Sequence, residues 1–310
     1  MAEPVALLAL AIDGAFGWPQ PLYRRIGHPV GWFAAIIGRC ETRWNQPSHG
    51  PAFRRAAGVA TVAILLIVAA GGGIALQLAL LPLGGGWVAV ALLAAPGLAQ
   101  RSLHQHVRAV EIALDARDLP TARIAAGHIV GRDTAGLDEA ALSRAAIESL
   151  SESFCDGVAA PLFWLLLLGL PGVWAYKAIN TADSLIGHRE PRWREFGWAA
   201  ARTDDLMNLI PARLSGPLIC LCGGGGWRMM ARDARRHASP NSGWPEAAMA
   251  GALGLSLGGP VSYDGVLHEK PWLGDGRHDA TARDISRALR IHACACLCLA
   301  AIAGGLAWAL

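Results

Sequence analysis

The chain has 310 residues, of which 53% are hydrophobic and only 16% are charged, and its mean hydropathy is +0.34. A soluble domain usually carries about a quarter charged residues, so this composition excludes an ordinary soluble protein and indicates a membrane protein. The net charge of +3 is small and is spread over several loops, which argues against nucleic acid as a partner.

The first apolar segment runs from Pro4 to Ile12 and lacks the preceding Lys or Arg of a signal peptide, so we expect a retained anchor. The loop that follows is rich in arginine and has one acid, Glu41. Short basic loops of this kind remain cytoplasmic, which predicts a cytoplasmic position for this loop. Its arginines are Arg24, Arg25, Arg39, Arg43, Arg54 and Arg55.

The longest apolar run extends from Ala56 to Gln100 and contains no Asp, Glu, Lys or Arg. Its 45 residues suffice for two crossings of about 20 residues each, which predicts a helical hairpin. We expect the turn at Leu83-Gly84-Gly85-Gly86, and Gly71-Gly72-Gly73 is the competing break.

Three further candidate spans are residues 157–176, 206–227 and 291–310, the second of which is interrupted by Arg213. Helix signals also dominate residues 137–156 and 279–290, and strand signals are nearly absent. The sequence therefore predicts an all-α, polytopic integral membrane protein with several transmembrane or re-entrant helices and helical polar loops. We expect a single membrane-embedded domain over residues 1–310.

A full crossing at residues 157–176 would separate the polar residues before it from those after it. If the two polar blocks form one site, the segments around Lys177 must instead dip in and return, or the block must line a cavity within the bilayer. The sequence leaves both alternatives open.

Seven cysteines occur at positions 40, 155, 220, 222, 294, 296 and 298, with no C-x-x-C motif and no His-x-x-x-His pair to complete a zinc site. Cys294, Cys296 and Cys298 lie two apart, a spacing that scatters side chains around a helix. We therefore expect small packing residues and no metal site made of cysteine.

Charged residues beside hydrocarbon are costly and are usually kept for a substrate or an ion. Arg144, Glu148, Glu152 and Asp156 follow at intervals of four, which places them along one helix face. Stacked acids repel one another unless a cation such as Mg²⁺ or an ammonium group lies between them. The alternative is a solvated helix face with one Arg144–Glu148 pair.

A second polar stripe follows at Lys177, Asn180 and Ser184, with Asp183 beside it, and suits phosphate or carboxylate oxygens. The alternative is an interfacial cap in which Lys177 extends to the headgroups. Acidic and basic residues also occur at the start of the next apolar stretch. We expect them at least to pair with one another, and the more specific hypothesis is that they bind a ligand. Those residues are Arg202, Asp204, Asp205, Asn208 and Arg213.

Residues 239–246 predict a turn and a helix that begins at Pro245, with Glu246 in its first turn. Free N–H groups at such a helix start bind anions, although ordinary capping is the commoner use. No G-x-x-x-x-G-K-[ST] motif occurs, which excludes a P-loop nucleotide site.

Several motifs in chain order resemble the CobD/CbiB family of cobalamin biosynthesis. They are Gly131-Arg132-Asp133-Thr134, the run from Asp156-Gly157 to Phe163-Trp164, the run from Tyr176-Lys177 to Asp183-Ser184, and Ser239-Pro240-Asn241. The resemblance extends from Asp13 to Gly258-Gly259-Pro260. Ser153 and His188 stand where the family usually has Asn and Tyr, so neither belongs to the predicted site.

The resemblance implies a multi-pass protein of the bacterial inner membrane that acts as an ATP-dependent acid–amine ligase of the adenosylcobinamide-phosphate synthase type. Such an enzyme joins aminopropanol, or aminopropanol phosphate, to the propionate carboxyl of adenosylcobyric acid. It also implies ATP, Mg²⁺ and a corrinoid substrate, with other cobalamin-pathway enzymes as further partners. The alternatives are a membrane corrinoid-handling or transport protein without a chemical step, and a sensory relative with a degraded site.

Within this interpretation, the predicted catalytic residues are acids, and three of them are also predicted to hold Mg²⁺ or the amine: Glu148, Glu152 and Asp156. The other two are Asp204 and Asp205. Lys177 and Arg202 are assigned to phosphate, and the corrin ring is expected against Trp164 or Trp198. The predicted substrate-binding residues are Arg132, Asp133, Lys177, Asn180, Asp183, Arg202, Asn208, Arg213, Ser239 and Asn241.

Overall fold

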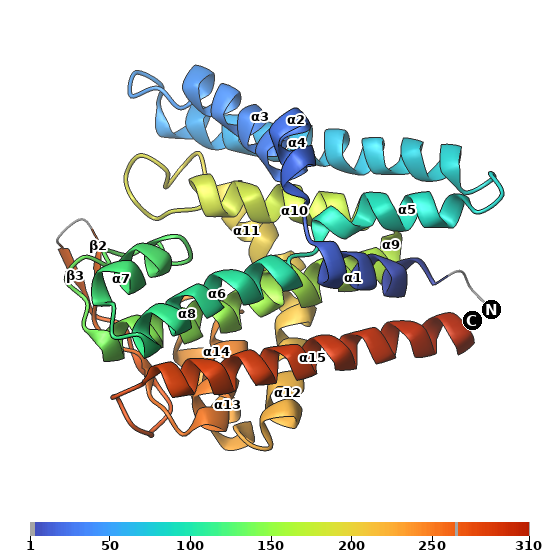
Figure 1. The fold of residues 1–310 in the computed structure, drawn as a ribbon. Helices are drawn as coiled ribbons and strands as arrows, with labels where there is room; N and C mark the ends of the chain where they lie inside the picture. Colours follow the sequence, from blue (N-terminus) through green and yellow to red (C-terminus); the bar gives the residue numbers. More distant parts are fainter. Residues whose placement is uncertain (1–3, 264–265, 310) are drawn as a thin grey trace. The chain divides into compact units, whose positions relative to one another are not determined.

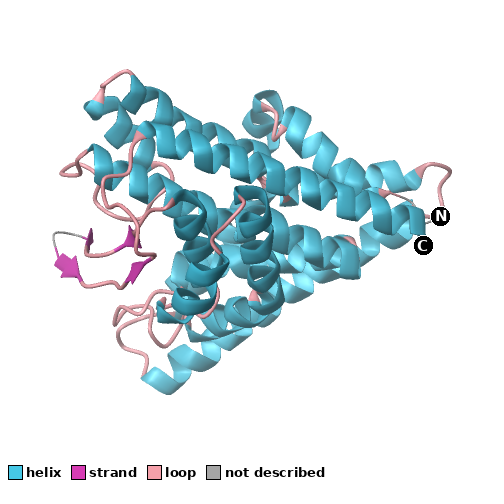
Figure 2. Cartoon of the chain, turned by 90° about the horizontal axis from the view of Figure 1, so that it is seen from below, coloured by secondary structure: helices cyan, strands magenta, loops and turns pink. Residues whose placement is uncertain are grey.

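The computed structural model describes residues 4–263 and 266–309, and it is built almost entirely of helices (Figure 1). The strands in these residues are short and pair antiparallel (Figure 2). They are β1 (Leu257–Gly258) with β4 (Trp272–Leu273), and β2 (Val261–Tyr263) with β3 (Val266–His268). The prediction of an all-α fold is confirmed.

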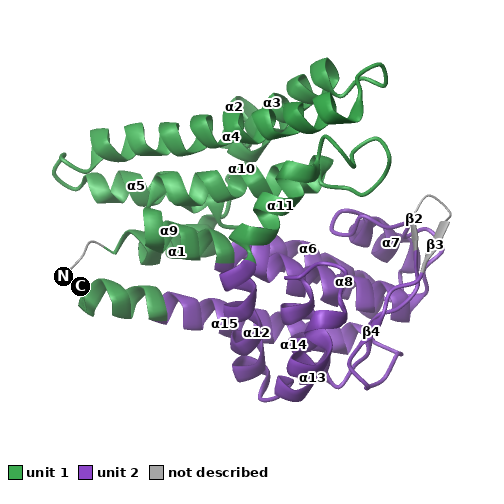
Figure 3. Ribbon diagram, turned by 180° about the vertical axis from the view of Figure 1, so that it is seen from behind, with its two compact units in different colours: residues 1–99, 160–208, 302–310 green, residues 100–159, 209–301 purple. Residues whose placement is uncertain are grey.

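The chain folds as two compact units, each assembled from segments that are distant in the sequence (Figure 3). Unit 1 contains Met1–Ala99, Ala160–Asn208 and Ile302–Leu310, and unit 2 contains Gln100–Ala159 and Leu209–Ala301. Each unit has its own core. The expected single domain stays a prediction.

Helix α10 (Leu170–Ile186) is central to unit 1, where it packs against α3, α4, α9 and α11. Helices α4 and α10 run side by side (Figures 1 and 3) because Gly73 lets the backbones approach: a Cβ there would lie 2.7 Å from the Pro171 nitrogen. Ile37, Leu65 and Ile179 fill the core between these helices. The other helices of the unit are α1 (Val5–Phe16), α2 (Gln20–Ile26), α3 (Pro29–Trp44), α4 (Pro51–Leu80), α5 (Gly86–Ala94), α9 (Ala160–Leu168) and α11 (Trp198–Met207).

The predicted hairpin has its turn where the sequence placed it, between Leu80 and Gly86. Gly85 adopts a left-handed backbone with φ of 76°, and the competing glycines at 71–73 lie inside α4. The returning arm is shorter than predicted. Helix α5 has 9 residues and passes into the short 3₁₀ turn η1 (Ala95–Gly97) around Pro96, so a second full crossing here was a wrong prediction.

The predicted span at residues 157–176 is also wrong, because the helix ends at Leu168. Gly169, with φ of 71°, turns the chain, and Pro171 begins the next helix. Helix α10 then packs against α9, and a Cβ on Gly172 would lie only 2.2 Å from the Trp164 carbonyl oxygen. The chain therefore doubles back, which is one of the alternatives that the sequence left open.

In unit 2, α14 (Gly243–Leu253) packs against α8, α12 and α13. Leu142, Ile147 and Leu150 on α8 are fully buried. The other elements are α6 (Gln100–Asp115), α7 (Leu119–Gly127), α8 (Glu139–Phe154), the π-helical η2 (Cys155–Ala159), α12 (Leu209–Gly223), α13 (Trp227–Asp233), the 3₁₀ turn η3 (Ala234–Arg236) and most of α15 (Ala282–Ala309).

The predicted span at residues 206–227 is broken at Asn208. Pro211 has no N–H to donate to the carbonyl of Met207, four residues earlier. That carbonyl instead accepts a hydrogen bond from Trp164 Nε1 at 3.1 Å. The polar interruption expected at Arg213 is therefore not what breaks the helix.

Three helices of the described residues are long and apolar enough to cross a membrane, and up to five are if each bent pair counts as one span. The three are Pro51–Leu80, Glu139–Leu168 and Ala282–Ala309; the bent pairs are Val5–Phe16 with Gln20–Trp44, and Trp198–Met207 with Leu209–Gly223. The last predicted span is confirmed, although its helix begins at Ala282 and includes the amphipathic segment before it. Several transmembrane or re-entrant helices are thus confirmed.

Candidate functional site

The predicted site residues form two polar groups, one in each unit. The group of unit 1 contains Lys177, Asn180, Asp183, Arg202, Asp204, Asp205 and Asn208. The group of unit 2 contains Arg132, Asp133, Glu148, Glu152, Asp156, Arg213, Ser239 and Asn241.

A cavity of about 270 Å³ lies beside α8 in unit 2. Asp138 caps this helix, since its Oδ1 accepts a hydrogen bond from the Ala141 N–H at 2.8 Å. Glu148 and Glu152, one turn apart, both line the cavity, as the spacing predicted. The polar and charged side chains of the lining are Arg132, Glu148, Ser149, Glu152, His237, Glu246 and Lys270.

Glu148 is paired with Arg132, and both side chains are largely buried, with 15% and 12% exposed. Glu148 also accepts a hydrogen bond from the Gly258 N–H at 2.8 Å. Arg144 instead donates to the His278 carbonyl and lies 5.6 Å above the Trp272 ring. The alternative of a solvated helix face with an Arg144–Glu148 pair is therefore wrong, because a carbonyl and an aromatic face from elsewhere in unit 2 hold Arg144.

Glu152 accepts a hydrogen bond from Ser242 Oγ at 2.8 Å, next to the start of α14. Asp156 does not line the cavity with the two glutamates. It lies in η2, and a π-helical turn carries an extra residue, so it breaks the register of four that the sequence pattern assumed. The three predicted magnesium ligands are thus not gathered around this cavity.

Glu246 is the third acid of the cavity, and the sequence had placed it only in the first turn of a helix. It is 5% exposed, and its Oε1 lies 3.7 Å from His237 Nε2. Burial raises the pKa of Glu246 well above its usual value, and the nearby charges of Glu152 and Glu148 add to this effect, whereas Lys270 and Arg132 oppose it.

Burial lowers the pKa of His237, although the attraction of Glu152 opposes this effect, so the neutral imidazole is favoured. Its Nδ1 accepts a hydrogen bond from the Ser239 N–H at 3.0 Å, which places the ring proton on Nε2, the atom facing Glu246. With Glu246 protonated, the charges of Arg132 and Lys270 balance those of Glu148 and Glu152.

The sequence did contain one signal for Lys270 that the pattern analysis missed. The chain has 27 Lys and Arg residues, yet only two are lysines, Lys177 and Lys270. Lys177 belongs to the polar group of unit 1, and Lys270 lines the cavity of unit 2. His237 and Glu246 gave no such signal, because only the fold shows that they are buried together.

The turn before α14 forms as predicted, with Ser239 Oγ accepting from the N–H groups of Asn241 and Ser242 at 3.2 and 3.3 Å. Asn241 Oδ1 accepts from Arg213 Nη1 at 3.3 Å, and Arg213 lies 5.0 Å above the Trp244 ring. Helix α14 begins at Gly243, two residues before the predicted start. Ser239, Asn241 and Arg213 stabilise this turn and do not line the cavity.

Polar side chains from α10 and α11 form a hydrogen-bonded series in unit 1. Tyr176 Oη donates to Asn208 Oδ1 at 2.9 Å, and Asn208 Nδ2 donates to Asp204 Oδ2 at 2.9 Å. Asn180 Nδ2 donates to the other oxygen of Asp204 at 3.3 Å, and Lys177 Nζ donates to Asn180 Oδ1 at 3.4 Å. Asp204 and Asn208 are buried, so the mutual pairing expected for them is confirmed.

Three other members of the unit 1 group lie on α10 and α11. Arg202 and Asp205 form an ion pair of 3.2 Å on α11, and Asp183 is half-buried on α10. Asp133 is exposed. Of the two tryptophans expected to contact the corrin ring, Trp164 is anchored to Met207, whereas Trp198 is 41% exposed and has Arg55 4.5 Å above its ring.

Comparison with known proteins adds a family to this geometry. The family model described as CobD/Cbib protein matches residues 6–292. A Rhodobacter capsulatus protein named "Cobalamin biosynthesis protein CobD" is 50% identical over 293 residues, which cover 92% of this chain and 91% of the relative. A protein of the same name from a Sinorhizobium species is 45% identical, with 97% of each chain covered. Another from Rhizobium meliloti is 43% identical, with 94% of this chain and 93% of the relative covered. No solved structure matches the chain significantly.

Proposed function

Because the chain belongs to the CobD/CbiB family of cobalamin biosynthesis, we propose that it is the amide ligase of that pathway. It joins aminopropanol or its O-phosphate to the propionate carboxyl of adenosylcobyric acid, and ATP activates the carboxyl. The product is adenosylcobinamide or its phosphate. We place the protein in the inner membrane of a bacterium, in keeping with its apolar helices and its bacterial relatives.

The chemistry sets the requirements for the site. A carboxylate oxygen attacks the terminal phosphorus of ATP, which gives an acyl phosphate and releases ADP. The amine nitrogen then attacks the acyl carbon, phosphate leaves, and the nitrogen gives up a proton. The site must therefore hold phosphate charges, position two reactants and accept a proton.

The single observation that carries the proposal is the set of charges around the cavity in unit 2. Arg132 and Lys270 line it and suit phosphate oxygens. Glu148 and Glu152 offer the hard oxygen donors that Mg²⁺ takes from one or two carboxylates, so the residues present fit this ion. Bound Mg²⁺ would neutralise the charge that develops on the phosphates.

Glu246 is the proposed proton acceptor. A carboxyl group whose pKa is raised toward the working pH is a stronger base than an exposed one. A cationic amine beside it favours its carboxylate form, so the amine and Glu246 exchange the proton that amide formation must remove. His237, 3.7 Å away, is placed to take part in the same transfer.

The volume of the cavity limits what enters it. A space of about 270 Å³ holds the propionate carboxyl, the amine and a phosphate group, but a corrin ring exceeds it. The ring must therefore lie outside the cavity. In unit 1, Lys177 and Arg202 are proposed to bind phosphate, and Asp204 and Asn208 to orient a substrate, as their polar network permits.

The test is a turnover assay with protein reconstituted in lipid nanodiscs. Adenosylcobyric acid, Mg-ATP and either amine are supplied, and the corrinoid product is identified by mass spectrometry. We expect amide product with the wild type and its loss in Glu246→Gln and Lys270→Met. Glu139→Gln is the matched control, because Glu139 is an exposed acid on the same helix as Glu148.

Corrinoid binding is measured in parallel by absorbance. Wild-type protein that binds the corrinoid but forms no amide would refute the ligase and favour a corrinoid carrier. Comparison of the two amines shows whether the substrate arrives phosphorylated.

A further inference from the structure

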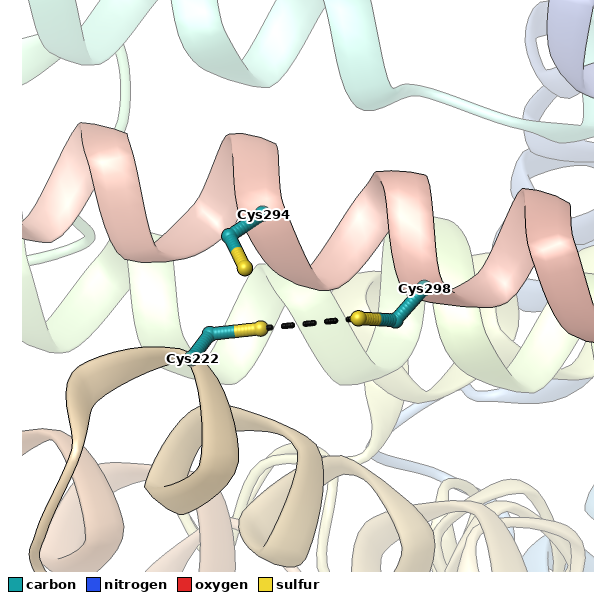
Figure 4. Close-up of side chains that lie close together, drawn as sticks. All are labelled: Cys222, Cys294 and Cys298. Atoms are coloured by element: carbon teal, nitrogen blue, oxygen red, sulfur yellow. Dashed lines mark hydrogen bonds between the residues drawn. The ribbon is translucent and has the colours of Figure 1, made fainter.

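Three cysteine sulfurs meet in unit 2, outside both polar groups (Figure 4). Cys294 and Cys298 lie one turn apart on α15, and Cys222 comes from the last turn of α12. The Sγ atoms all lie within 4.8 Å of one another, and those of Cys222 and Cys298 are 3.8 Å apart. The predicted scatter of the cysteines around the helix is thus wrong for residues 294 and 298, whose spacing of four places them on one face.

These three cysteines differ from the other four in burial. Cys40, Cys155, Cys220 and Cys296 are buried, as small packing residues usually are. Cys222 and Cys298 are half-buried, and Cys294 is exposed. The three clustered thiols are thus more accessible than the four buried ones.

The spacing of the sulfurs suits a metal ion. A metal–sulfur bond of about 2.3 Å in a trigonal arrangement places three sulfurs about 4.0 Å apart. A disulfide needs about 2.05 Å, which is much shorter than the 3.8 Å between Cys222 and Cys298. Within residues 4–263 and 266–309 this group contains cysteines alone, so the donor set is soft and has three members.

We propose that Cys222, Cys294 and Cys298 bind one copper(I) ion. Soft thiolates favour copper(I) over hard cations, and three sulfurs without a nitrogen or oxygen donor fit it better than zinc, which usually takes four ligands. Binding converts thiols to thiolates and releases their protons to solvent, with no change in oxidation state.

The position of the cluster supports a cation. Cys294 and Cys298 lie near the middle of a 28-residue helix long enough to cross a membrane, where unpaired thiolates would be costly. Cys222 lies at the C-terminal, negative end of α12, which also disfavours a lone thiolate. A bound copper(I) ion would offset one of the three thiolate charges, and it would join α12 to α15 within unit 2.

The test is a copper(I) titration of the reduced protein in nanodiscs, without oxygen, against a coloured copper(I) chelator. We expect one equivalent to bind to the wild type. Cys222→Ser, Cys294→Ser and Cys298→Ser should each weaken binding at least about tenfold. Cys220→Ser and Cys296→Ser are the matched controls on the same two helices and should bind as the wild type does.

Circular dichroism and thiol labelling accompany the titration. The site is supported if bound copper protects the three cysteines from the alkylating reagent while the helicity stays unchanged. The proposal is overturned if the wild type binds no stoichiometric copper, if the controls lose binding equally, or if zinc binds and copper does not. It is also overturned if the reduced protein binds no copper and yields only a Cys222–Cys298 disulfide on exposure to air.

Discussion

Replacing Glu246 by glutamine should separate the effect of the buried side chain on stability from the effect of its titrating proton. Gln has nearly the same shape as the protonated acid, so near pH 4.5, the ordinary pKa of a glutamic acid, the variant should be within about 1 kcal/mol of the wild type in stability. The folded-state pKa of Glu246 is raised above the unfolded value, so the folded state binds its proton more tightly. Its contribution is therefore fully present below pH 4.5 and is lost as the pH rises through the folded pKa.

The difference between the two proteins isolates this one group from all other titrations. Above pH 4.5, wild-type stability should fall relative to Glu246→Gln by about 1.4 kcal/mol per pH unit until the folded pKa is reached. Unfolding is followed by tryptophan fluorescence in detergent at a series of pH values. If the stability curves of the two proteins against pH are parallel, the raised pKa of Glu246 is refuted. General bases contribute about 10²- to 10⁴-fold to a rate, so ligation by Glu246→Gln at more than a hundredth of the wild-type rate would refute the role of Glu246 as a base.

Two further predictions concern the scaffold of the two units. Arg132→Met should lower the stability of unit 2 by about 3 kcal/mol, because it leaves the buried Glu148 carboxylate without its cation. The double variant Arg132→Met/Glu148→Leu should recover most of this loss. A double variant that is as unstable as the single one in the same unfolding assay would contradict a coupled pair. Gly73→Ala should destabilise unit 1 by about 1–3 kcal/mol, because the added Cβ would lie 2.7 Å from the Pro171 backbone. Gly72→Ala is the control and should be neutral, because a Cβ there would have nothing within 4 Å. Equal melting temperatures for the two variants would exclude close packing of α4 on α10.

The sequence predicted elements well where local chemistry decides them. The turn after α4 follows from its glycines, and the shared face of Glu148 and Glu152 follows from helical periodicity. It failed where the same apolar composition fits more than one path. The uncharged run at residues 157–176 gives no sign of the π-helical turn before Ala160, and Gly169 and Pro171 break it although both are compatible with membrane helices.

The candidate site was predictable only in part, because both the cavity of unit 2 and the hydrogen-bonded series of unit 1 depend on tertiary burial. Nothing near Glu246 in the sequence shows that Lys270 and Glu152 lie in the same cavity, since these residues come from three separate segments. The effect of Pro211 was similarly concealed. Pro211 has no N–H to donate to the Met207 carbonyl, and only the structure shows that Trp164 Nε1 donates to this carbonyl instead.

The way the two units share the chain has a consequence for biogenesis. A ribosome that has made residues 1–99 must also make 100–159 before it reaches the next segment of unit 1, and the last segment of that unit follows residue 301. Neither unit can be finished during translation before the other has been started. A fragment cut at residue 208 lacks α12, α13 and α14, so it retains only part of unit 2, and chimeras of relatives should exchange discontinuous segments together.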